Sequence, residues 1–314
     1  MTRKRKLVYG ATALLALLVA LELFCRFSLG LGDPPLSRAD PEIEYLFVGP
    51  RTYHRFGNTI VYNSFSMRTH EFDARRKNPD EIRIMVCGDS VINGGALTDQ
   101  SQLMTTRMEE HLKAERHSPA VVMNVSAGSW GPPNYLAYVK RFGLFEANAL
   151  VIVVSEGDFG DAPTFAPIVG VSPDFPDKTP TFALGEALTR YLPRYVPFLG
   201  PPTPPPQPVT QGEIDQAMGA FRELIALAQH RDIPVIVALH TEQAEYGKPE
   251  TEGHMLFREA CAELHVVRVE LADTFAPDMK AGGKPYSDDV HPNAHGQELM
   301  ERAIFPEVVK TLRK

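Results

Sequence analysis

The segment Ala149–Ser155 reads Ala-Leu-Val-Ile-Val-Val-Ser and contains no charged residue. An unbroken apolar run of this length is typical of a strand that is buried on both faces. Strands of this kind occur in parallel sheets whose two faces are covered by helices. The run therefore favours an α/β fold.

Strand-like and helix-like segments alternate along most of the chain. Further strands are predicted at Ile82–Cys87, Val121–Ser126, Pro234–His240 and Val266–Glu270. Helices are predicted from Thr98 or Asp99 to about Arg116 and at Asn134–Phe145, Glu213–Arg231, Glu252–Leu264 and Asn293–Arg313. This alternation implies parallel strands joined by right-handed crossovers. We expect a flavodoxin-like, three-layer α/β/α sandwich with a mainly parallel sheet of about five strands.

The bulk composition excludes several classes of protein. A chain of 314 residues suits one large α/β domain with appendages. Its net charge of −7 argues against a nucleic-acid binder that tracks phosphates. The three cysteines are too few and too scattered for a disulfide framework or a zinc site. We expect neither a metal nor a cofactor.

The N-terminus predicts a membrane anchor. Four basic residues at 3–6 precede an apolar run over residues 7–25, which only Glu22 interrupts. A run of about 18 residues is at the short end of what spans a bilayer. The preceding basic cluster predicts a single-pass protein of the inner membrane, with a cytoplasmic N-terminus and a periplasmic domain. A cleaved signal peptide is the alternative.

Three regions follow from these patterns. Residues 1–30 form the cytoplasmic tip and anchor, residues 31–80 a stalk and docking segment with one short strand at Thr59–Asn63, and residues 81–314 the catalytic domain. An irregular insertion at about 160–210 carries eight prolines between Pro193 and Pro208. Long irregular loops serve as lids, substrate grooves or partner surfaces. A tolerated surface insertion is the alternative.

Ser90 is the candidate nucleophile. It follows the first core strand in Gly88-Asp89-Ser90, which places it at the carboxyl edge of the sheet, where ligands bind. A serine hydroxyl needs a base to remove its proton, and a histidine held by a carboxylate can do this. Asp288 precedes His291 by three residues in a loop after the last strand. One loop at the same edge therefore carries a base and its orienting group.

Three stretches of this chain together resemble the SGNH/GDSL hydrolase superfamily: Gly88-Asp89-Ser90, the block from Asn124 to Gly131, and Asp288–His291. The resemblance covers about residues 82–314. It implies that Ser90 is the nucleophile, His291 the base and Asp288 its orienting residue.

The resemblance also implies an oxyanion hole, which is a set of hydrogen-bond donors for the negative oxygen that forms during acyl transfer. Its expected members are the backbone N–H of Ser90, the N–H of Gly128 and an asparagine side chain from a third block. Ser129 or Gly131 replaces Gly128 if the alignment is slightly different.

The third block departs from the family pattern. That pattern is G-x-N-D or G-N-D, whereas this chain reads Ser155-Glu156-Gly157-Asp158. Asp158 matches the aspartate, but the asparagine is missing. Loss of one oxyanion donor costs on the order of 100–1,000-fold in rate. Asn93 and Asn134 are candidates to replace it; otherwise the enzyme is slow without its partner or substrate, or no longer catalyses.

Three functions are consistent with these patterns. The leading one is a serine esterase or O-deacetylase that acts on acyl esters, with a cell-surface or exported glycan as a reasonable substrate. The second is an O-acyltransferase that passes acyl groups to a polysaccharide, together with a membrane-bound O-acyltransferase partner. The third is a non-catalytic glycan-binding or scaffold protein, and the altered third block is the reason to consider it. Trp130 is either a sugar-stacking wall or a packing residue, and we expect His240 to be structural.

Overall fold

The computed structural model describes residues 2–196 and 208–312 of the chain. Its main sheet has five parallel strands in the order β6-β5-β7-β8-β9. Their bounds are β5 Ile82–Gly88, β6 Ala120–Ser126, β7 Ala149–Val154, β8 Val235–Leu239 and β9 Val267–Glu270. The predicted α/β class, the parallel sheet and the positions of its strands are therefore confirmed.

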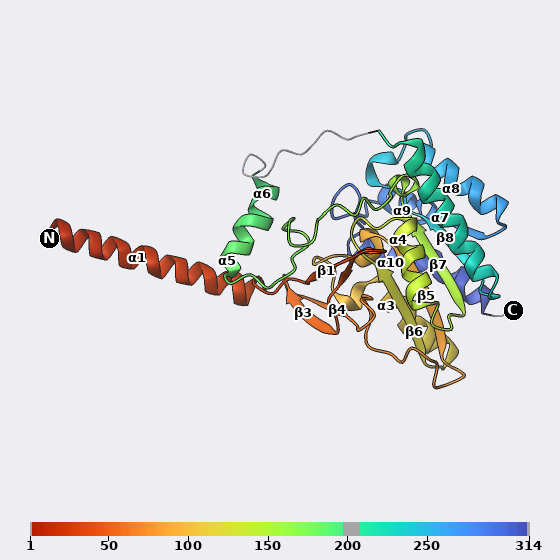
Figure 1. Cartoon of the computed structure of the whole chain (residues 1–314), viewed down its shortest axis with the longest axis horizontal. Helices are drawn as coiled ribbons and strands as arrows, with labels where there is room; N and C mark the ends of the chain where they lie inside the picture. Colours follow the sequence, from red (N-terminus) through yellow and green to blue (C-terminus); the bar gives the residue numbers. More distant parts are fainter. Residues whose placement is uncertain (1, 197–207, 313–314) are drawn as a thin grey trace.

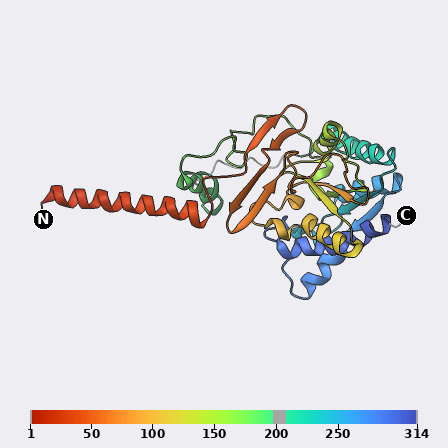
Figure 2. The same cartoon turned by 90° about the horizontal axis from the view of Figure 1, so that it is seen from below.

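Helices cover both faces of this sheet (Figures 1 and 2). One layer consists of α4 (Pro132–Phe142), α7 (Gln211–Gln229) and α8 (Glu252–Glu263). The other consists of α3 (Met104–Arg116), α9 (Ala272–Lys280) and α10 (Ala294–Thr311). Successive side chains of a strand point to opposite faces, so the β5 residues Met85 and Ile84 enter the first and the second layer respectively.

Two elements of the domain differ from the sequence expectation. Helix α9 was not predicted, because Pro277 in its interior interrupts the helical pattern. The insertion is not irregular throughout: α5 (Ala183–Glu186), a π-helical stretch (Ala187–Tyr191) and α6 (Leu192–Tyr195) follow one another without a break. Much of the proline-rich part, residues 197–207, lies outside the described residues.

The segment before the domain forms two antiparallel hairpins. They consist of β1 (Ser37–Asp40) with β2 (Glu44–Phe47) and of β3 (Arg51–Arg55) with β4 (Asn58–Tyr62). The sequence predicted only the last of these strands, because β1 and β3 are mostly polar and β2 is only four residues long.

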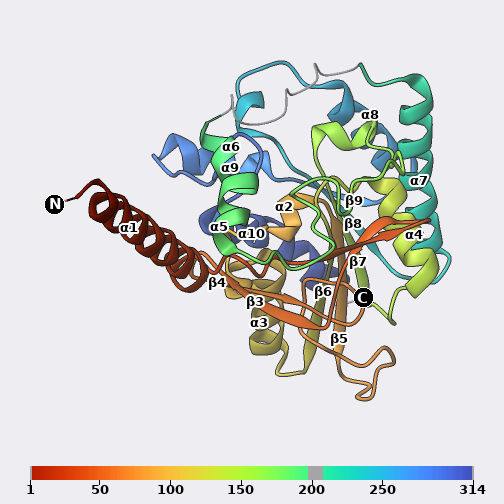
Figure 3. The same cartoon turned by 60° about the vertical axis from the view of Figure 1, so that its left-hand side comes forward.

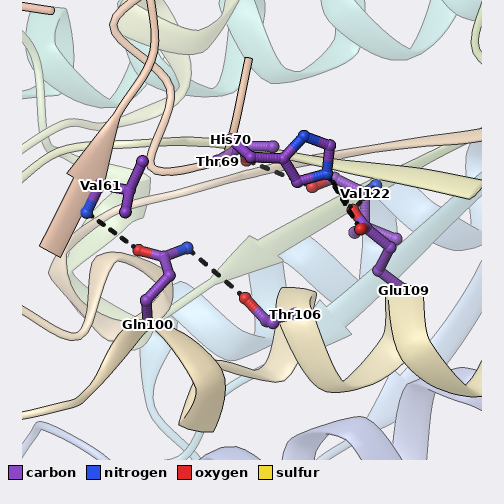
Figure 4. Close-up of a pocket in the computed structure, with 7 residues that line it drawn as sticks. All are labelled: Val61, Thr69, His70, Gln100, Thr106, Glu109 and Val122. Carbon is purple, nitrogen blue, oxygen red and sulfur yellow. Dashed lines mark hydrogen bonds and ion pairs between the residues drawn. The ribbon is translucent and has the colours of Figure 1, made fainter. Parts of the chain in front are cut away.

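Polar side chains dock this segment on α3 and the turn before it (Figure 4). The amide of Gln100 accepts a hydrogen bond from the backbone N–H of Val61 at 3.2 Å, and His70 contacts Glu109 at 3.0 Å. The hydrogen bond to Glu109 raises the pKa of His70 to about 9. These residues surround a cavity of about 70 Å³, which lies beside β4 and α3.

Helix α1 (Arg3–Leu23) extends away from the folded part of the chain, and none of its residues is buried (Figure 1). With its π-helical continuation to Ser28 it is long and apolar enough to be a membrane span or a signal sequence. Glu22 lies near its end and accepts hydrogen bonds from the backbone N–H groups of Ala183 and Leu184, at 3.0 and 2.8 Å. Helix α5 is therefore docked against the end of α1 (Figure 3).

A buried ion pair fixes this contact to the hairpins. The carboxylate of Glu186 in α5 binds the guanidinium of Arg55 in β3, and both side chains are almost completely buried. Glu186 also accepts a hydrogen bond from the backbone N–H of Gly32 at 2.6 Å. Tyr191 contacts Arg55 at 3.0 Å. The insertion, the segment directly after the N-terminal helix and the second hairpin thus meet at one charged pair.

We expect Glu186→Ala to undock the helical part of the insertion. The substitution leaves the buried charge of Arg55 without a carboxylate partner, which costs about 3–5 kcal/mol. Amide hydrogen exchange at residues 183–195 should then become at least about 100-fold faster. In the matched control, Glu223→Ala removes half of an exposed pair with Lys140, whose side chains are 54% and 51% exposed, and should cost less than about 1 kcal/mol. If residues 183–195 exchange their amide hydrogens equally slowly in both variants, the pair of Arg55 and Glu186 does not hold this part of the insertion in place.

Candidate active site

Ser90 begins a short helix, α2 (Ser90–Asn93), directly after β5. The carboxylate of Asp89 caps this helix by accepting a hydrogen bond from the backbone N–H of Val91 at 2.9 Å. A Cβ atom on Gly88 would lie 2.5 Å from a side-chain carbon of Ile92. The first two residues of Gly-Asp-Ser therefore have local structural roles. Gly88 allows α2 to pack closely against the end of β5, and Asp89 caps α2.

Three buried side chains hold the other end of α2. Gln297 donates to the carbonyl of Val91 at 2.7 Å, and Asn124 donates to that of Ile92 at 3.1 Å. Arg68 donates to the carbonyl of Asn93 at 2.6 Å. The three donors come from α10, β6 and the docking segment, and all are fully buried. They fix the backbone that carries the nucleophile.

Sequence reasoning missed these three residues as part of the site. Asn124 offered a signal, since it is a polar residue inside the otherwise apolar run Val121–Val125. Buried polar groups need hydrogen-bond partners, so such a residue indicates a specific contact. Arg68 and Gln297 offered none, because arginine and glutamine are ordinary surface residues in a loop and a helix.

The structure brings the predicted triad together. The Nε2 atom of His291 lies 2.9 Å from Oγ of Ser90, and its Nδ1 atom lies 2.8 Å from Oδ2 of Asp288. A carboxylate only accepts hydrogen bonds, so Nδ1 carries the proton and Nε2 is free to accept from the serine hydroxyl. Burial opposes ionisation of Asp288, but hydrogen bonds from His291 and Val290 outweigh it and lower the pKa of this carboxyl.

The loop that carries His291 is tied to the end of β8. Tyr286 donates to the carbonyl of Thr241 at 2.5 Å, and the backbone N–H of Gln243 donates to the carbonyl of Asp289 at 2.7 Å. His240 is fully buried and binds the carbonyl of Val290 through Nε2 at 2.8 Å. Burial lowers the pKa of His240 to about 4, so its ring is neutral. His240 is structural, as expected from the sequence, and its role is to position the loop.

The two asparagines suggested as replacement oxyanion donors have other partners. Asn93 accepts from the hydroxyl of Tyr62 at 3.1 Å and donates to the carbonyl of Ser126 at 3.0 Å. Asn134 accepts from the backbone N–H of Gly131 at 3.0 Å and donates to the carbonyl of Ile43 at 2.7 Å. Both amides are buried in structural contacts. The suggestion that either one supplies the missing donor is therefore not supported.

Gly128 lies at the expected edge of the sheet. Ser126 at the end of β6 pairs with Gly88 at the end of β5, so the turns that carry Gly128 and Ser90 leave neighbouring strands side by side. The carbonyl of Gly128 accepts from the hydroxyl of Tyr45 at 2.6 Å, which fixes this turn. Its role as an oxyanion donor stays a prediction. Trp130 in the same block is 1% exposed and packs against Tyr45, so it is a packing residue.

An acidic cleft of about 330 Å³ adjoins the triad. The residues that line it are Asp89, Ser155, Gly157, Asp158, Gly160, Asp161, Val209, Glu242 and Val290. They come from the turns after β5, β7 and β8, from the segment before α7 and from the loop that carries His291. The carboxylate of Asp158 accepts a hydrogen bond from the backbone N–H of Ser155 at 2.7 Å, which gives it a structural role. If Asp158 is aligned with the aspartate of the family's third block, Gly157 stands where the asparagine is expected.

The surroundings of the carboxyl groups in this cleft disfavour their ionised form. Burial raises the pKa of Asp89 to about 6. Burial and the charges of Asp89 and Glu44 raise the pKa of Asp161 to about 7. Burial and the charge of Asp89 also raise the pKa of Asp158. Within residues 2–196 and 208–312, no group of three or more His, Cys, Asp and Glu residues is placed to hold a metal ion.

Several solved structures are similar to this chain in fold. A mutant of Axe2, an acetyl-xylooligosaccharide esterase from Geobacillus stearothermophilus, is 14% identical, with 72% of this chain and 94% of that chain covered and a TM-score of 0.47. A lipolytic protein of the G-D-S-L family from Veillonella parvula is 13% identical over 72% of this chain and 97% of that chain, with a TM-score of 0.42.

A two-domain esterase active on acetylated mannans is 14% identical over 74% of this chain and 49% of that chain, with a TM-score of 0.47. No protein-family model and no curated protein sequence matches the chain. The sheet order and the contacts of His291 with Ser90 and with Asp288 agree with the resemblance of this chain to the SGNH/GDSL hydrolases.

We expect Asp288→Asn to slow the labelling of Ser90 by a fluorophosphonate about 10³–10⁴-fold. An amide at this position no longer fixes the tautomer of His291 that accepts the serine proton. Asp289→Asn is the matched control, because Asp289 contacts Gln243 through its backbone carbonyl, which the substitution retains. The rate of labelling can be followed by mass spectrometry of the intact protein. Similar labelling rates for the two variants would show that Asp288 does not help His291 to activate Ser90.

Proposed function

We propose that this protein is a serine esterase that cleaves O-acyl esters through an acyl-serine intermediate. The observation that carries the proposal is the 2.9 Å contact between Nε2 of His291 and Oγ of Ser90, with Nδ1 of the same ring held by Asp288. A serine with this environment is an activated nucleophile at neutral pH.

The expected cycle has two halves. Oγ of Ser90 attacks the ester carbonyl while its proton passes to Nε2 of His291, and the negative charge of Asp288 stabilises the imidazolium that forms. The same proton then passes to the leaving alcohol as the ester bond breaks, which leaves an acyl-serine. Water, deprotonated by His291, attacks this intermediate and releases the acid. The backbone N–H groups of Ser90 and Gly128 are the proposed donors to the oxyanion.

The proposed location follows from the N-terminal helix. Basic residues precede α1, so the chain is expected to cross the inner membrane once, with its catalytic domain in the periplasm. A domain at that place meets cell-surface and exported glycans, and we infer that O-acyl groups of such a glycan are the substrate.

Acyl transfer to a polysaccharide is the second candidate. Two observations favour it: the apolar helix, which would hold the domain beside a membrane-bound O-acyltransferase, and Gly157 at the place of the missing amide. A weakened oxyanion hole makes hydrolysis slow, and a bound partner or acceptor then has more to contribute. In this reaction a sugar hydroxyl takes the place of water in the second half of the cycle.

We expect the full-length chain in detergent to hydrolyse 4-nitrophenyl acetate, and Ser90→Ala to abolish this activity. Release of 4-nitrophenol measures acylation, and release of acetate measures the second step. If the acetyl group leaves Ser90 only when a glycan acceptor is added, and is then found as an ester on that acceptor, the protein is an acyltransferase and not a hydrolase. If Ser90 neither cleaves the ester nor takes a fluorophosphonate label, the chain is no serine enzyme, and a binding or scaffold role remains.

We expect Gly157→Asn to increase hydrolysis of 4-nitrophenyl acetate at least about tenfold. The cleft has room for the new side chain, since a Cβ atom on Gly157 meets no atom within 4 Å. An oxyanion donor is worth on the order of 100–1,000-fold in rate, and an amide without evolved support should recover part of this. Gly157→Leu, which fills the same space without a donor, is the control. No gain over this control would show that the oxyanion hole already has its donors.

A further inference from the structure

The acidic cleft beside the triad has a composition that a neutral acyl ester does not require. We propose that this cleft binds a positively charged organic group of the substrate, such as an ammonium, next to the ester that Ser90 attacks. This inference rests on the proposed esterase function for the reaction, but the cation site itself can be tested without catalysis.

The position of the cleft makes it a substrate subsite. Asp89, which lines it, directly precedes Ser90, and Val290, which also lines it, directly precedes His291. The space therefore opens alongside the two residues between which the ester must lie. Its volume of about 330 Å³ is large enough for a substituted ammonium group.

The charge of the cleft has one sign. Asp89, Asp158 and Asp161 come from the turns after β5 and β7, and Glu242 follows β8. Within the described residues, none of these four carboxyls forms an ion pair with a lysine or an arginine. The ring of His291 lies close enough to Asp89 to act on it electrostatically. Carboxylates at close range repel one another, and a bound cation removes that repulsion. Burial is the largest cause of the raised pKa values of Asp89, Asp158 and Asp161, and the charge of Asp89 adds to it at Asp158 and Asp161.

A hydroxyl group supplies an independent observation. Ser155 lines the cleft, is 5% exposed, and its Oγ atom has no hydrogen-bond partner. A buried polar atom without a partner is destabilising, so such an atom in a cleft indicates a ligand that contacts it. The positive charge of an organic cation offsets the carboxylates, and a polarised C–H or N–H group beside its nitrogen can contact this oxygen. No three of the described acidic residues are placed to hold a metal ion, so an organic cation fits the site better.

The test compares two thioesters of the same shape. Acetylthiocholine carries a quaternary nitrogen where S-(3,3-dimethylbutyl) thioacetate carries a carbon atom, and release of the thiol measures both reactions. We expect the full-length chain to prefer the cationic ester about tenfold in kcat/KM, with the preference falling as salt is added. Asp161→Asn should reduce the preference at least threefold, and Glu242→Gln should also reduce it.

Asp73→Asn is the matched control for these variants. Asp73 is exposed, and its carbonyl binds Arg83 at the amino end of β5, so it lies at the opposite edge of the sheet from Ser90. This control should keep the preference for the cationic ester. Equal kcat/KM values for the two esters in the unaltered chain, or a preference that survives both Asp161→Asn and Glu242→Gln, would overturn the proposal.

A binding measurement separates this proposal from the esterase function. We expect choline to bind the full-length Ser90→Ala chain in calorimetry, 3,3-dimethylbutanol not to bind, and Asp161→Asn in the same background to weaken choline binding at least fivefold. If neither thioester is cleaved but choline binds in this way, the cation site stands and the esterase function fails. If both esters are cleaved equally in a Ser90-dependent reaction and choline does not bind, the esterase function stands and the cation site is wrong.

Discussion

The site depends on the hydrogen bonds that fix the short helix α2. Its carbonyl groups at Val91, Ile92 and Asn93 each accept a hydrogen bond from a buried side chain of a different part of the chain. A helix of four residues has no stability of its own, so its geometry comes from these partners. Because Arg68 is one of them, the docking segment before the domain is part of the support of the nucleophile.

The parallel sheet explains why distant residues meet. Strands β5, β7 and β8 are neighbours and run in one direction, so the turns after them lie along one edge. Ser90 follows the first of these strands, the acidic turn at Asp158 follows the second, and Thr241, which accepts from Tyr286 of the catalytic loop, follows the third. The triad and the cleft are therefore two consequences of the same strand order.

The sequence predicted the parts of the site that short local patterns determine. Ser90, Asp288 and His291 lie in turns whose residues also fix the turn itself, as the cap by Asp89 shows. The support by Arg68 was not predictable, because it depends on a loop docking against residues 25 positions further along the chain. The same holds for Glu186, whose partner Arg55 is 131 positions away, and for Asn93 and Asn134, whose buried partners only the tertiary structure reveals.

In the proposed esterase reaction, the missing amide and the acidic cleft have a combined effect. The oxyanion that forms at the attacked carbonyl is destabilised by nearby carboxylates, and this chain has Gly157 where an amide would offset part of that effect. A substrate with a positive charge in the cleft neutralises the carboxylates before the oxyanion forms. A neutral ester does not neutralise these carboxylates, so their negative charge continues to destabilise the oxyanion. Selectivity for a charged substrate can thus arise without a new donor, because the field that slows the reaction of neutral esters is the field that binds the cation.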